Sequence, residues 1–353
     1  MTRRAFLEGL SASAVLSHYP EPTRRLLEEA SRRPPDPIKP RALRPGMTIG
    51  LVAPASHLFD PDGYRRAEAR ARSLGFKPKL FPAATSVHGY LAGEDMARAA
   101  DLNAAFADDK VDAVWCLRGG YGCLRTLPHV DFDLIKRNPK VFIGYSDITA
   151  LHLAIQKLVG LVTFHGPMLG SDVSEPSWDA VRRVVMTAKP AGPIGPVSSE
   201  SPSAGQVAAD ERVVTLTGGV ARGRLTGGNL SLVTRLLGTP FEPDLKGRIL
   251  FLEDVGEAGY RIDGMLSQLR LSGKLGACAG IVFGRFTDAG GGGQPVKLPL
   301  ETILRELTMD LGIPVSWGFR CGHVDDQTTV PYGVNAELNA DSGTVRLVDS
   351  AVR

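Results

Sequence analysis

The chain has 353 residues, 43% of them hydrophobic and 22% charged, which is typical of a globular protein long enough for two domains. Its formal net charge at pH 7 is +3 and no block of one sign stands out, which argues against nucleic acid or an anionic membrane as a partner. The four cysteines form no CxxC pair and have no histidine at finger spacing, so we expect no metal site.

The first 46 residues contain an export-like segment and a proline-rich lead-in. MTRRAFLEGLSASAVLS has Arg3 and Arg4 before a short run of apolar and small residues, which is the pattern of a twin-arginine export signal. Glu8 interrupts that run, so an amphipathic N-terminal helix in a cytoplasmic protein is the alternative. The pattern favours export to the periplasm. No later segment has the roughly 20 consecutive apolar residues of a membrane span, and we expect no stable membrane insertion.

Strand and helix patterns alternate over residues 47–188. Apolar runs at MTIGLVAPAS, KPKLFP, VDAVWCLRGG and KVFIG predict four strands, and GYRRAEARARSLG, GEDMARAADLNAAFADD and DFDLIKRNP predict the helices between them. Strands that alternate with helices indicate a parallel sheet with right-handed crossovers. We therefore predict an α/β fold whose N-terminal domain is a Rossmann-like parallel sheet with helices on both faces. Ligands bind at the carboxyl ends of such strands, so the strand ends APAS, RGGYG and GYSD should face one pocket.

Residues 189–206 are rich in proline, glycine and serine, which predicts a linker between two domains. Over residues 207–353, GRILFLED, AGIVFGRF and TVRLVD predict strands, and GYRIDGMLSQLRLSG and LETILRELTMDLG predict helices. We therefore expect the second, C-terminal domain to be a mixed α/β domain. The glycine-rich stretch DAGGGGQP is typical of a surface loop.

The stretch VFIGYSDITALHLAIQKL places Ser146 between the fourth predicted strand and a helix pattern. A serine on a sharp strand-to-helix turn projects its hydroxyl above the sheet, as a nucleophile elbow does. The orphan amides and the positive dipole of a helix N-terminus suit a developing oxyanion. A helix cap formed by Ser146 or Asp147 is the simpler interpretation, and GYSD departs from the GxSxG of common hydrolases.

A serine nucleophile needs a general base and a third group that holds the base. Of the seven histidines, His165 follows an apolar run and His323 lies in a polar loop, and the residues alone do not rank one above the other. Glu253, in RILFLEDVGE, closes an apolar strand, where a carboxylate is costly unless it is paired. A helix cap or a structural ion pair is the alternative role for Glu253.

Seven motifs occur in one order along the chain: RGGYG, GYSDITALH, FHGPM, TGGNLSLVTRLLGTP, FLEDVGE, GRF and GHVDDQTTVPYGVNAEL. Together they resemble the serine LD-carboxypeptidase family, which comprises the murein tetrapeptide carboxypeptidases, and its relatives the microcin C self-immunity proteins. The resemblance extends from about Met47 to Leu338 and covers both predicted domains.

The resemblance implies a Ser-Glu-His triad divided between the two domains. By motif, the nucleophile falls on Ser146, the glutamate on Glu253 and the histidine on His323, which decides between the two candidate histidines. The oxyanion donors would be the amides of Gly120 and Asp147. The implied activity is that of a serine-type carboxypeptidase that uses no metal or organic cofactor and releases the terminal D-alanine of a peptidoglycan stem tetrapeptide through an acyl-enzyme. The resemblance also implies a homodimer.

Two further residues are candidates for substrate binding. Arg118, at the end of the third predicted strand, could hold a substrate carboxylate, with a structural ion pair as the alternative, and His165 could line the pocket.

Two other functions stay open. One is hydrolysis of peptidyl or aminoacyl sulfamoyl adenylates, for which Trp178 would stack on the nucleobase. A single tryptophan on an amphipathic helix is more often part of the core, which is the alternative role for Trp178. The other is non-catalytic muropeptide binding, with RGGYG as an anion-binding nest.

Overall fold

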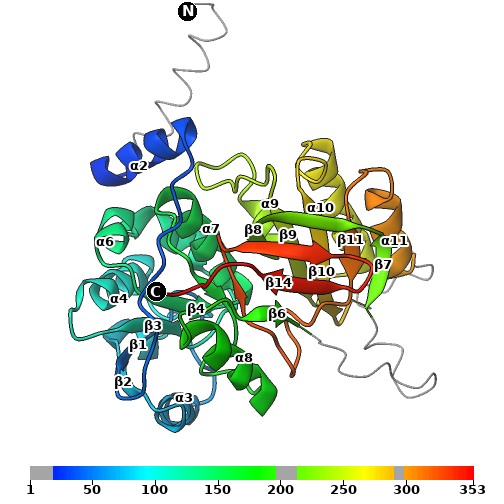
Figure 1. Ribbon diagram of the computed structural model, residues 1–353. Helices are drawn as coiled ribbons and strands as arrows, with labels where there is room; N and C mark the ends of the chain where they lie inside the picture. Colours follow the sequence, from blue (N-terminus) through cyan, green and yellow to red (C-terminus); the bar gives the residue numbers. More distant parts are fainter. Residues whose placement is uncertain (1–18, 196–212, 290–297) are drawn as a thin grey trace, which may run out of the picture.

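The computed structural model describes residues 19–195, 213–289 and 298–353, which fold around two β-sheets (Figure 1). Their helices are α2 (Glu21–Arg32), α3 (Gly63–Ser73), α4 (Asp95–Ala107), α5 (Cys123–Thr126), α6 (Phe132–Arg137), α7 (Thr149–Leu158), α8 (Glu175–Val185), α9 (Leu230–Arg235), α10 (Gly259–Leu271) and α11 (Leu300–Thr308), with the short 3-10 helices η1 (Pro82–Thr85), η2 (Leu127–His129) and η3 (Ser146–Ile148). The predicted export segment, most of the predicted linker and most of the glycine-rich stretch lie outside the described residues. Within the described ranges, no helix has the length and apolar character needed to cross a membrane.

The first sheet contains the four predicted parallel strands and two further strands at one edge. Its strands lie in the order β12-β5-β4-β3-β1-β2. They are β1 (Thr48–Val52), β2 (Lys77–Leu80), β3 (Ala113–Cys116), β4 (Val141–Gly144), β5 (Phe164–His165) and β12 (Val330–Pro331). Every neighbouring pair is parallel except β12 and β5, which are antiparallel. Because β12 comes from near the C-terminus, the second half of the chain contributes an edge strand to the first sheet.

Helices cover both faces of the first sheet. Trp115 of β3 and Phe142 of β4 point to opposite faces, because the register partner of Phe142 is Val114. The ring of Phe106 in α4 lies 6.0 Å from that of Phe142, and the ring of Trp178 in α8 lies 6.3 Å from that of Trp115. Since α4 and α8 therefore lie on opposite faces, the prediction of a Rossmann-like sheet covered on both sides is confirmed.

The second sheet is mixed, which confirms the predicted class of the C-terminal domain. Its strands lie in the order β6-β14-β13-β8-β9-β10-β11-β7. They are β6 (Gly192–Ile194), β7 (Val214–Thr217), β8 (Val220–Asn229), β9 (Ile249–Val255), β10 (Gly280–Thr287), β11 (Val315–Trp317), β13 (Asn335–Asn339) and β14 (Thr344–Leu347). The four strands β8 to β11 pair in parallel, and the pairs outside them are antiparallel. Helix α10 packs against α9 and α11.

Several elements lie where the sequence pattern predicts none, and three of them are instructive. Helix α2 precedes the lead-in, β6 lies inside the predicted linker, and β8 occupies the glycine-rich stretch VARGRLTGGN. Glycine is depleted in strands, which is why the pattern of β8 does not indicate one. The glycines have a packing role here, because a Cβ at Gly227 would lie 1.9 Å from the carbonyl oxygen of Phe251 in β9.

The two sheets meet along α7 and β8. The amide of Asn229, at the end of β8, donates to Oγ1 of Thr149 at 3.1 Å, and the hydroxyl of Tyr332 donates to the carbonyl of Gly227 at 3.1 Å. These contacts place the carboxyl end of the second sheet against the start of α7, and therefore next to the turn that carries Ser146.

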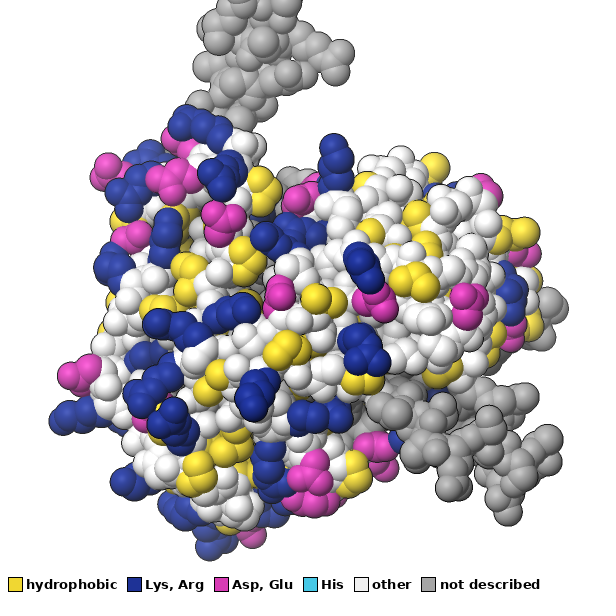
Figure 2. Space-filling view, in the orientation of Figure 1, with side chains coloured by type: hydrophobic (Ala, Val, Ile, Leu, Met, Phe, Trp, Pro, Cys, Tyr) yellow, Lys and Arg dark blue, Asp and Glu magenta, His cyan; other side chains and the backbone are white. Residues whose placement is uncertain are grey.

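On the face shown in Figure 2, basic side chains are spread with acidic ones among them, and hydrophobic side chains form only small separate groups.

Candidate active site

Ser146 lies on a tight turn between β4 and α7. β4 ends at Gly144, Tyr145 is extended, and Ser146 opens η3, which continues into α7. The φ of Ser146 is 63°, in the left-handed region that residues other than glycine rarely adopt. Backbone strain of this kind persists only where the surrounding structure imposes it, and a nucleophile elbow is one such place. The predicted strand-to-helix turn is present, and it is strained.

His323 connects Ser146 to Glu253. Its Nε2 lies 3.0 Å from Oγ of Ser146, and its Nδ1 lies 2.8 Å from Oε2 of Glu253. Because an ionised carboxylate only accepts hydrogen bonds, Nδ1 carries the proton and Nε2 presents its lone pair to the serine hydroxyl. This arrangement can take the proton of Ser146 and can stabilise the imidazolium that results.

Three separate parts of the fold supply these side chains: the turn after β4, strand β9, and the loop between β11 and β12. Glu253 is fully buried, whereas the side chain of His323 keeps 20% of its surface exposed. Burial lowers the pKa of His323, but the charge and the hydrogen bond of Glu253 outweigh it, so the pKa is raised. Oε1 of Glu253 has no hydrogen-bond partner among the described residues, so the hydrogen bond to His323 carries much of the compensation for this buried carboxylate.

Two glycines permit the close approach of these segments. A Cβ at Gly322 would lie 2.5 Å from Oε2 of Glu253, and a Cβ at Gly119 would lie 2.9 Å from Cβ of Ser146. Contacts this short exclude any side chain, so only glycine fits at either position. The RGGYG loop therefore lies directly against Ser146.

The three predicted strand ends lie together, as expected for one pocket. Ser56, at the end of APAS, donates its amide to the carbonyl of Gly119 at 3.1 Å. Its hydroxyl accepts a hydrogen bond from the amide of Tyr121 at 3.2 Å. The loop after β1 thus supports the RGGYG loop, which in turn contacts the Ser146 turn.

Asp147 ties the RGGYG loop to the Ser146 turn. Its carboxylate accepts a hydrogen bond from the amide of Cys123 at 2.7 Å, and burial raises the pKa of this carboxyl. Asp147 is therefore a structural link, and its backbone amide directly follows Ser146 in the chain. Gly120, with a φ of 99°, belongs to the loop that Asp147 holds. The structure thus brings the two predicted oxyanion donors into segments that meet at Ser146.

Arg118 lies at the start of the RGGYG loop and has no acidic partner among the described residues. Its guanidinium stacks over the ring of Phe59, with Cζ 4.0 Å from the ring centroid. Burial lowers the pKa of Arg118, so leaving its charge unpaired carries a cost. The structural ion pair considered as its alternative role is not found in the described part of the chain, and the charge is free to meet a ligand.

Two residues that the sequence suggests as ligand contacts are fully buried instead. His165 in β5 packs between the rings of Tyr145 and Phe251, at 5.8 and 5.3 Å, and burial holds its pKa well below the usual value. Trp178 packs against Trp115 in the core of the first sheet. Neither side chain is exposed. The burial of His165 corrects its expected place in the pocket lining, whereas the burial of Trp178 agrees with its alternative role as a core residue of an amphipathic helix.

A polar network beside the triad is not predicted from the sequence. Asp254 accepts hydrogen bonds from Nδ2 of Asn229 at 2.9 Å and from the amide and hydroxyl of Ser231 at 2.9 and 2.8 Å. The side chain of Gln327 donates to the carbonyl of Gly322 and so fixes the loop of His323. The motif TGGNLSLVTRLLGTP contains Asn229 and Ser231, and it is the signal from which this network could have been found.

The described residues contain no cluster of three or more histidine, cysteine, aspartate or glutamate side chains that could hold a metal ion. All four cysteines are buried and free. Their burial is typical of cysteines that act as small core residues.

Both halves of the chain match models of known protein families. The family model for the LD-carboxypeptidase N-terminal domain matches residues 49–166, and the model for the C-terminal domain matches residues 222–338. A Bacillus subtilis protein named probable murein peptide carboxypeptidase is 42% identical over 87% of this chain and 93% of its own. The microcin C7 self-immunity protein of Escherichia coli is 28% identical over 89% of this chain and 96% of its own. The structure of muramoyltetrapeptide carboxypeptidase from Oxalobacter formigenes superimposes with a TM-score of 0.71 at 29% identity, covering 85% of this chain and 98% of that one.

Proposed function

The chain belongs to the LD-carboxypeptidase family, and from this premise we propose that it is a serine peptidase that releases the terminal D-alanine of peptidoglycan stem tetrapeptides. The observation that carries the proposal is the chain of hydrogen bonds from Ser146 through His323 to the buried Glu253. The similarity to the Bacillus subtilis and Oxalobacter formigenes proteins supports a murein peptide as the substrate.

The first half of the proposed reaction forms an acyl-enzyme. Nε2 of His323 accepts the hydroxyl proton while Oγ of Ser146 attacks the carbonyl carbon of the amide between the L-centre and D-alanine. The amides of Gly120 and Asp147 hold the negative oxygen of the tetrahedral intermediate. His323 then gives its proton to the leaving nitrogen, so D-alanine departs and the tripeptide remains as an ester on Ser146.

The second half hydrolyses that ester. His323 takes a proton from water, the resulting hydroxide attacks the ester carbonyl, and the proton returns to Oγ of Ser146 as the tripeptide leaves. Glu253 stays ionised throughout and holds the Nδ1 proton, which stabilises the imidazolium in both halves. Every group in this scheme belongs to the chain, so the proposal includes no metal and no organic cofactor.

We assign recognition of the terminal carboxylate to Arg118. A carboxypeptidase has to bind the free carboxylate beside the bond that it cleaves, and a guanidinium can grip a carboxylate with two parallel hydrogen bonds. Arg118 is oriented by Phe59 and lies in the loop that contacts Ser146. Its unpaired charge is the feature that supports this role.

Hydrolysis of peptidyl or aminoacyl sulfamoyl adenylates is the alternative, supported by the similarity to the microcin C7 self-immunity protein. That function needs an aromatic side chain that can stack on a nucleobase. Trp178, the candidate from the sequence, is fully buried. This burial and the higher identity to the murein peptide carboxypeptidase favour the tetrapeptide as substrate.

Incubation of the purified protein with a disaccharide-tetrapeptide, and separately with glutamyl sulfamoyl adenosine, separates the candidates when the products are read by mass spectrometry. We expect conversion of the tetrapeptide to the tripeptide with release of D-alanine. Cleavage of the sulfamoyl compound alone would favour the alternative. Binding of the tetrapeptide without cleavage would favour the third interpretation, a non-catalytic muropeptide-binding protein.

We further propose that the protein acts in the periplasm, on the basis of the Arg3-Arg4 pattern, and that it forms a homodimer, on the basis of the family resemblance. The alternative to export is a cytoplasmic enzyme. Light scattering on the purified protein tests the homodimer, because a monomeric mass at working concentration would contradict it.

A further inference from the structure

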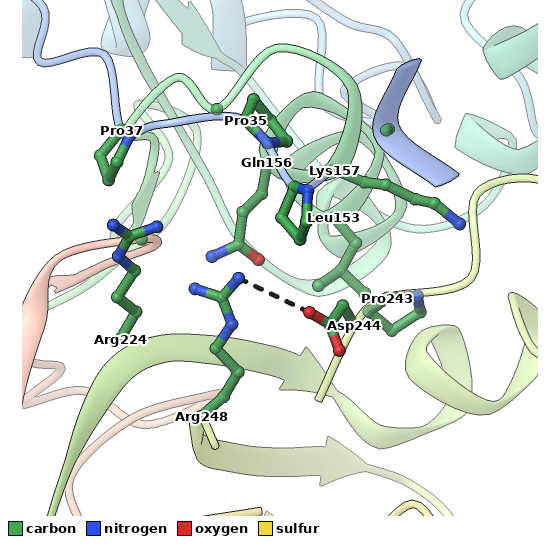
Figure 3. Close-up of a pocket in the computed structure, with 13 residues that line it drawn as sticks. Pro35, Pro37, Leu153, Gln156, Lys157, Arg224, Pro243, Asp244 and Arg248 are labelled. Carbon is green, nitrogen blue, oxygen red and sulfur yellow. Dashed lines mark ion pairs between the residues drawn. The ribbon is translucent and has the colours of Figure 1, made fainter. Parts of the chain in front are cut away.

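A small cavity lies where the lead-in crosses the junction of the two sheets (Figure 3). Its volume is about 50 Å³, and its lining includes Pro35, Pro37, Gln156, Arg224, Asp244 and Arg248. The lead-in is fixed above it by backbone hydrogen bonds from Ile38 to Gly160 and from Val162 to Ile38, each 2.9 Å long. The cavity is near the C-terminal end of α7, so roughly 15 Å of helix separates it from the Ser146 turn.

Two arginines point into this cavity with little to offset their charge. Arg248 has one acidic partner, Asp244, and the closest approach of that pair is 3.8 Å. Arg224 has no ion pair or hydrogen bond from its side chain within the described ranges. Burial is the main cause that lowers the pKa of Arg248; the charge of Asp244 opposes this effect, and the charge of Arg224 adds to it. The lining of the cavity therefore has two guanidinium groups and one carboxylate, that of Asp244.

The remaining polar side chains of the cavity are already engaged. Gln156 donates to the carbonyl of Leu225 at 3.0 Å and accepts from Thr226 at 2.7 Å. Lys157 also lines the cavity, but its ammonium donates to the carbonyl of Glu242 at 2.8 Å and points away from the arginines in Figure 3. The guanidinium groups of Arg224 and Arg248, which lie near the Gln156 amide in Figure 3, are thus the groups left to bind a ligand.

We propose that Arg224 and Arg248 form a binding site for one small oxyanion, a phosphate or a carboxylate, at the junction of the two sheets. A guanidinium fork matches the oxygen spacing of both groups, and two guanidinium side chains line this cavity. The cavity is about three to five times the ~10–15 Å³ that one water molecule needs, so it admits an oxyanion. The site is separate from the triad, and the inference does not depend on the proposed peptidase activity.

The position of the site gives it a structural consequence. Arg248 immediately precedes β9, which leads to Glu253, and α7 leads from the Ser146 turn to the cavity. An oxyanion held by the second sheet would fill the space beneath the lead-in and against α7. Because such a ligand binds the folded chain and not the unfolded one, it raises the melting temperature.

Isothermal titration of the purified full chain with inorganic phosphate, and separately with acetate, tests the site at an ionic strength held constant with sodium chloride. We expect saturable binding of one ion per chain to the wild type. Arg224→Gln and Arg248→Gln should each weaken binding at least about tenfold, the loss expected for one charge-assisted pair. Arg222→Gln is the matched control, since Arg222 lies on the same face of β8 but is exposed and paired with Glu337, and its affinity should stay within about twofold of wild type.

Arg224→Lys and Arg248→Lys are second variants for the case that a glutamine variant fails to fold. They keep the positive charge and remove only the planar guanidinium group. They should melt close to the wild type and bind the ion more weakly than it does. Binding of phosphate but not acetate assigns the site to tetrahedral anions, and the reverse assigns it to carboxylates. Absence of saturable binding of both ions by the wild type, or equal affinity of the wild type and Arg224→Gln, overturns the proposal.

Discussion

The turn at Ser146 stores strain at a single residue. A residue with a Cβ in the left-handed region costs roughly 1–2 kcal/mol, whereas glycine adopts that region freely. We therefore predict that Ser146→Gly is more stable than Ser146→Ala by about 1 kcal/mol, the reverse of the usual order of glycine and alanine. The free energy of unfolding, measured in urea, checks the difference.

Ser86 provides the control for this comparison, because it is exposed and its φ is −75°. At that position alanine should be at least as stable as glycine. An Ser146→Ala variant more stable than Ser146→Gly would contradict the strain at the turn.

His323 predicts the pH dependence of the reaction. Its pKa is raised above 6.5 by Glu253, and it acts as a base only when neutral, so kcat/KM should rise with pH along a limb centred above pH 6.5. The free energy of unfolding should change with pH in the opposite direction. The stabilisation from the charged His323–Glu253 pair is complete below about pH 6.5 and is lost as the pH rises through the raised pKa of His323.

Glu253→Gln removes the main cause of this shift, so the pKa of His323 should fall in that variant. An NMR titration of the His323 ring in both proteins measures the change directly. A pKa at or below 6.5 in the wild type, unchanged by Glu253→Gln, would show that Glu253 does not act on His323.

At the scale of elements, the triad depends on β9 and on the loop between β11 and β12 being held together. If Glu253 acts only through His323, removing both should be little worse than removing the histidine. We predict that Glu253→Gln and His323→Ala each lower kcat by orders of magnitude, and that the double variant is close to His323→Ala. A double-mutant cycle on folded proteins, with a melting temperature for each, measures the coupling.

Additive losses in that cycle, from variants that melt like the wild type, would remove Glu253 from the triad. Asp254 and Glu257 are the other acids of the same segment. Asp254 is already bound by Asn229 and Ser231, and Glu257 by Arg261 at 3.6 Å, so neither is free to replace Glu253.

The elements that the sequence predicts well are those whose pattern is local. β4 is a continuous apolar run and β9 begins with one. The helix patterns between strands of the first sheet correspond to α3, α4 and α6. β8 is not indicated by its pattern because its glycines serve the contact with β9, which is a tertiary feature. β12 is two residues long and exists as a strand only through its pairing with β5.

The same distinction applies to the site. Ser146 and Glu253 stand at the ends of predicted strands, and family motifs point to His323, so the sequence suggests all three. The burial of His165 could not be predicted, because it depends on which rings pack against it from other elements. For Trp178, the helical pattern already offered a core position as the alternative. For Arg118, the sequence does not decide between carboxylate binding and a structural ion pair. Only the fold shows that Arg118 has no acidic partner among the described residues.

At the scale of the whole molecule, the prediction of where the protein works rests on the N-terminal segment. Residues 1–18 lie outside the described residues, so the twin-arginine pattern stays a prediction. A fusion of residues 1–40 to a reporter should reach the periplasm, and replacement of Arg3 and Arg4 by lysine should block it, because the signal is read by a receptor. A reporter that stays in the cytoplasm in both cases would favour the amphipathic-helix alternative.

The triad itself is a property of the assembled molecule. Ser146 comes from the first sheet and Glu253 from the second, and His323 lies in the loop through which the chain returns to the first sheet at β12. Correct docking of the two sheets is therefore needed before His323 can bridge the other two residues.

The most direct test of the account is to trap the acyl-enzyme. Wild type mixed with a disaccharide-tetrapeptide, quenched in acid and mapped by mass spectrometry, should carry the tripeptide-containing acyl group on the peptide that contains Ser146. Ser146→Ala should show no adduct, and its kcat should fall by at least about 10⁴-fold while its melting temperature stays close to that of the wild type. Release of D-alanine by folded Ser146→Ala at a rate within about tenfold of wild type, with no adduct on either protein, would contradict the assignment of Ser146 as the nucleophile.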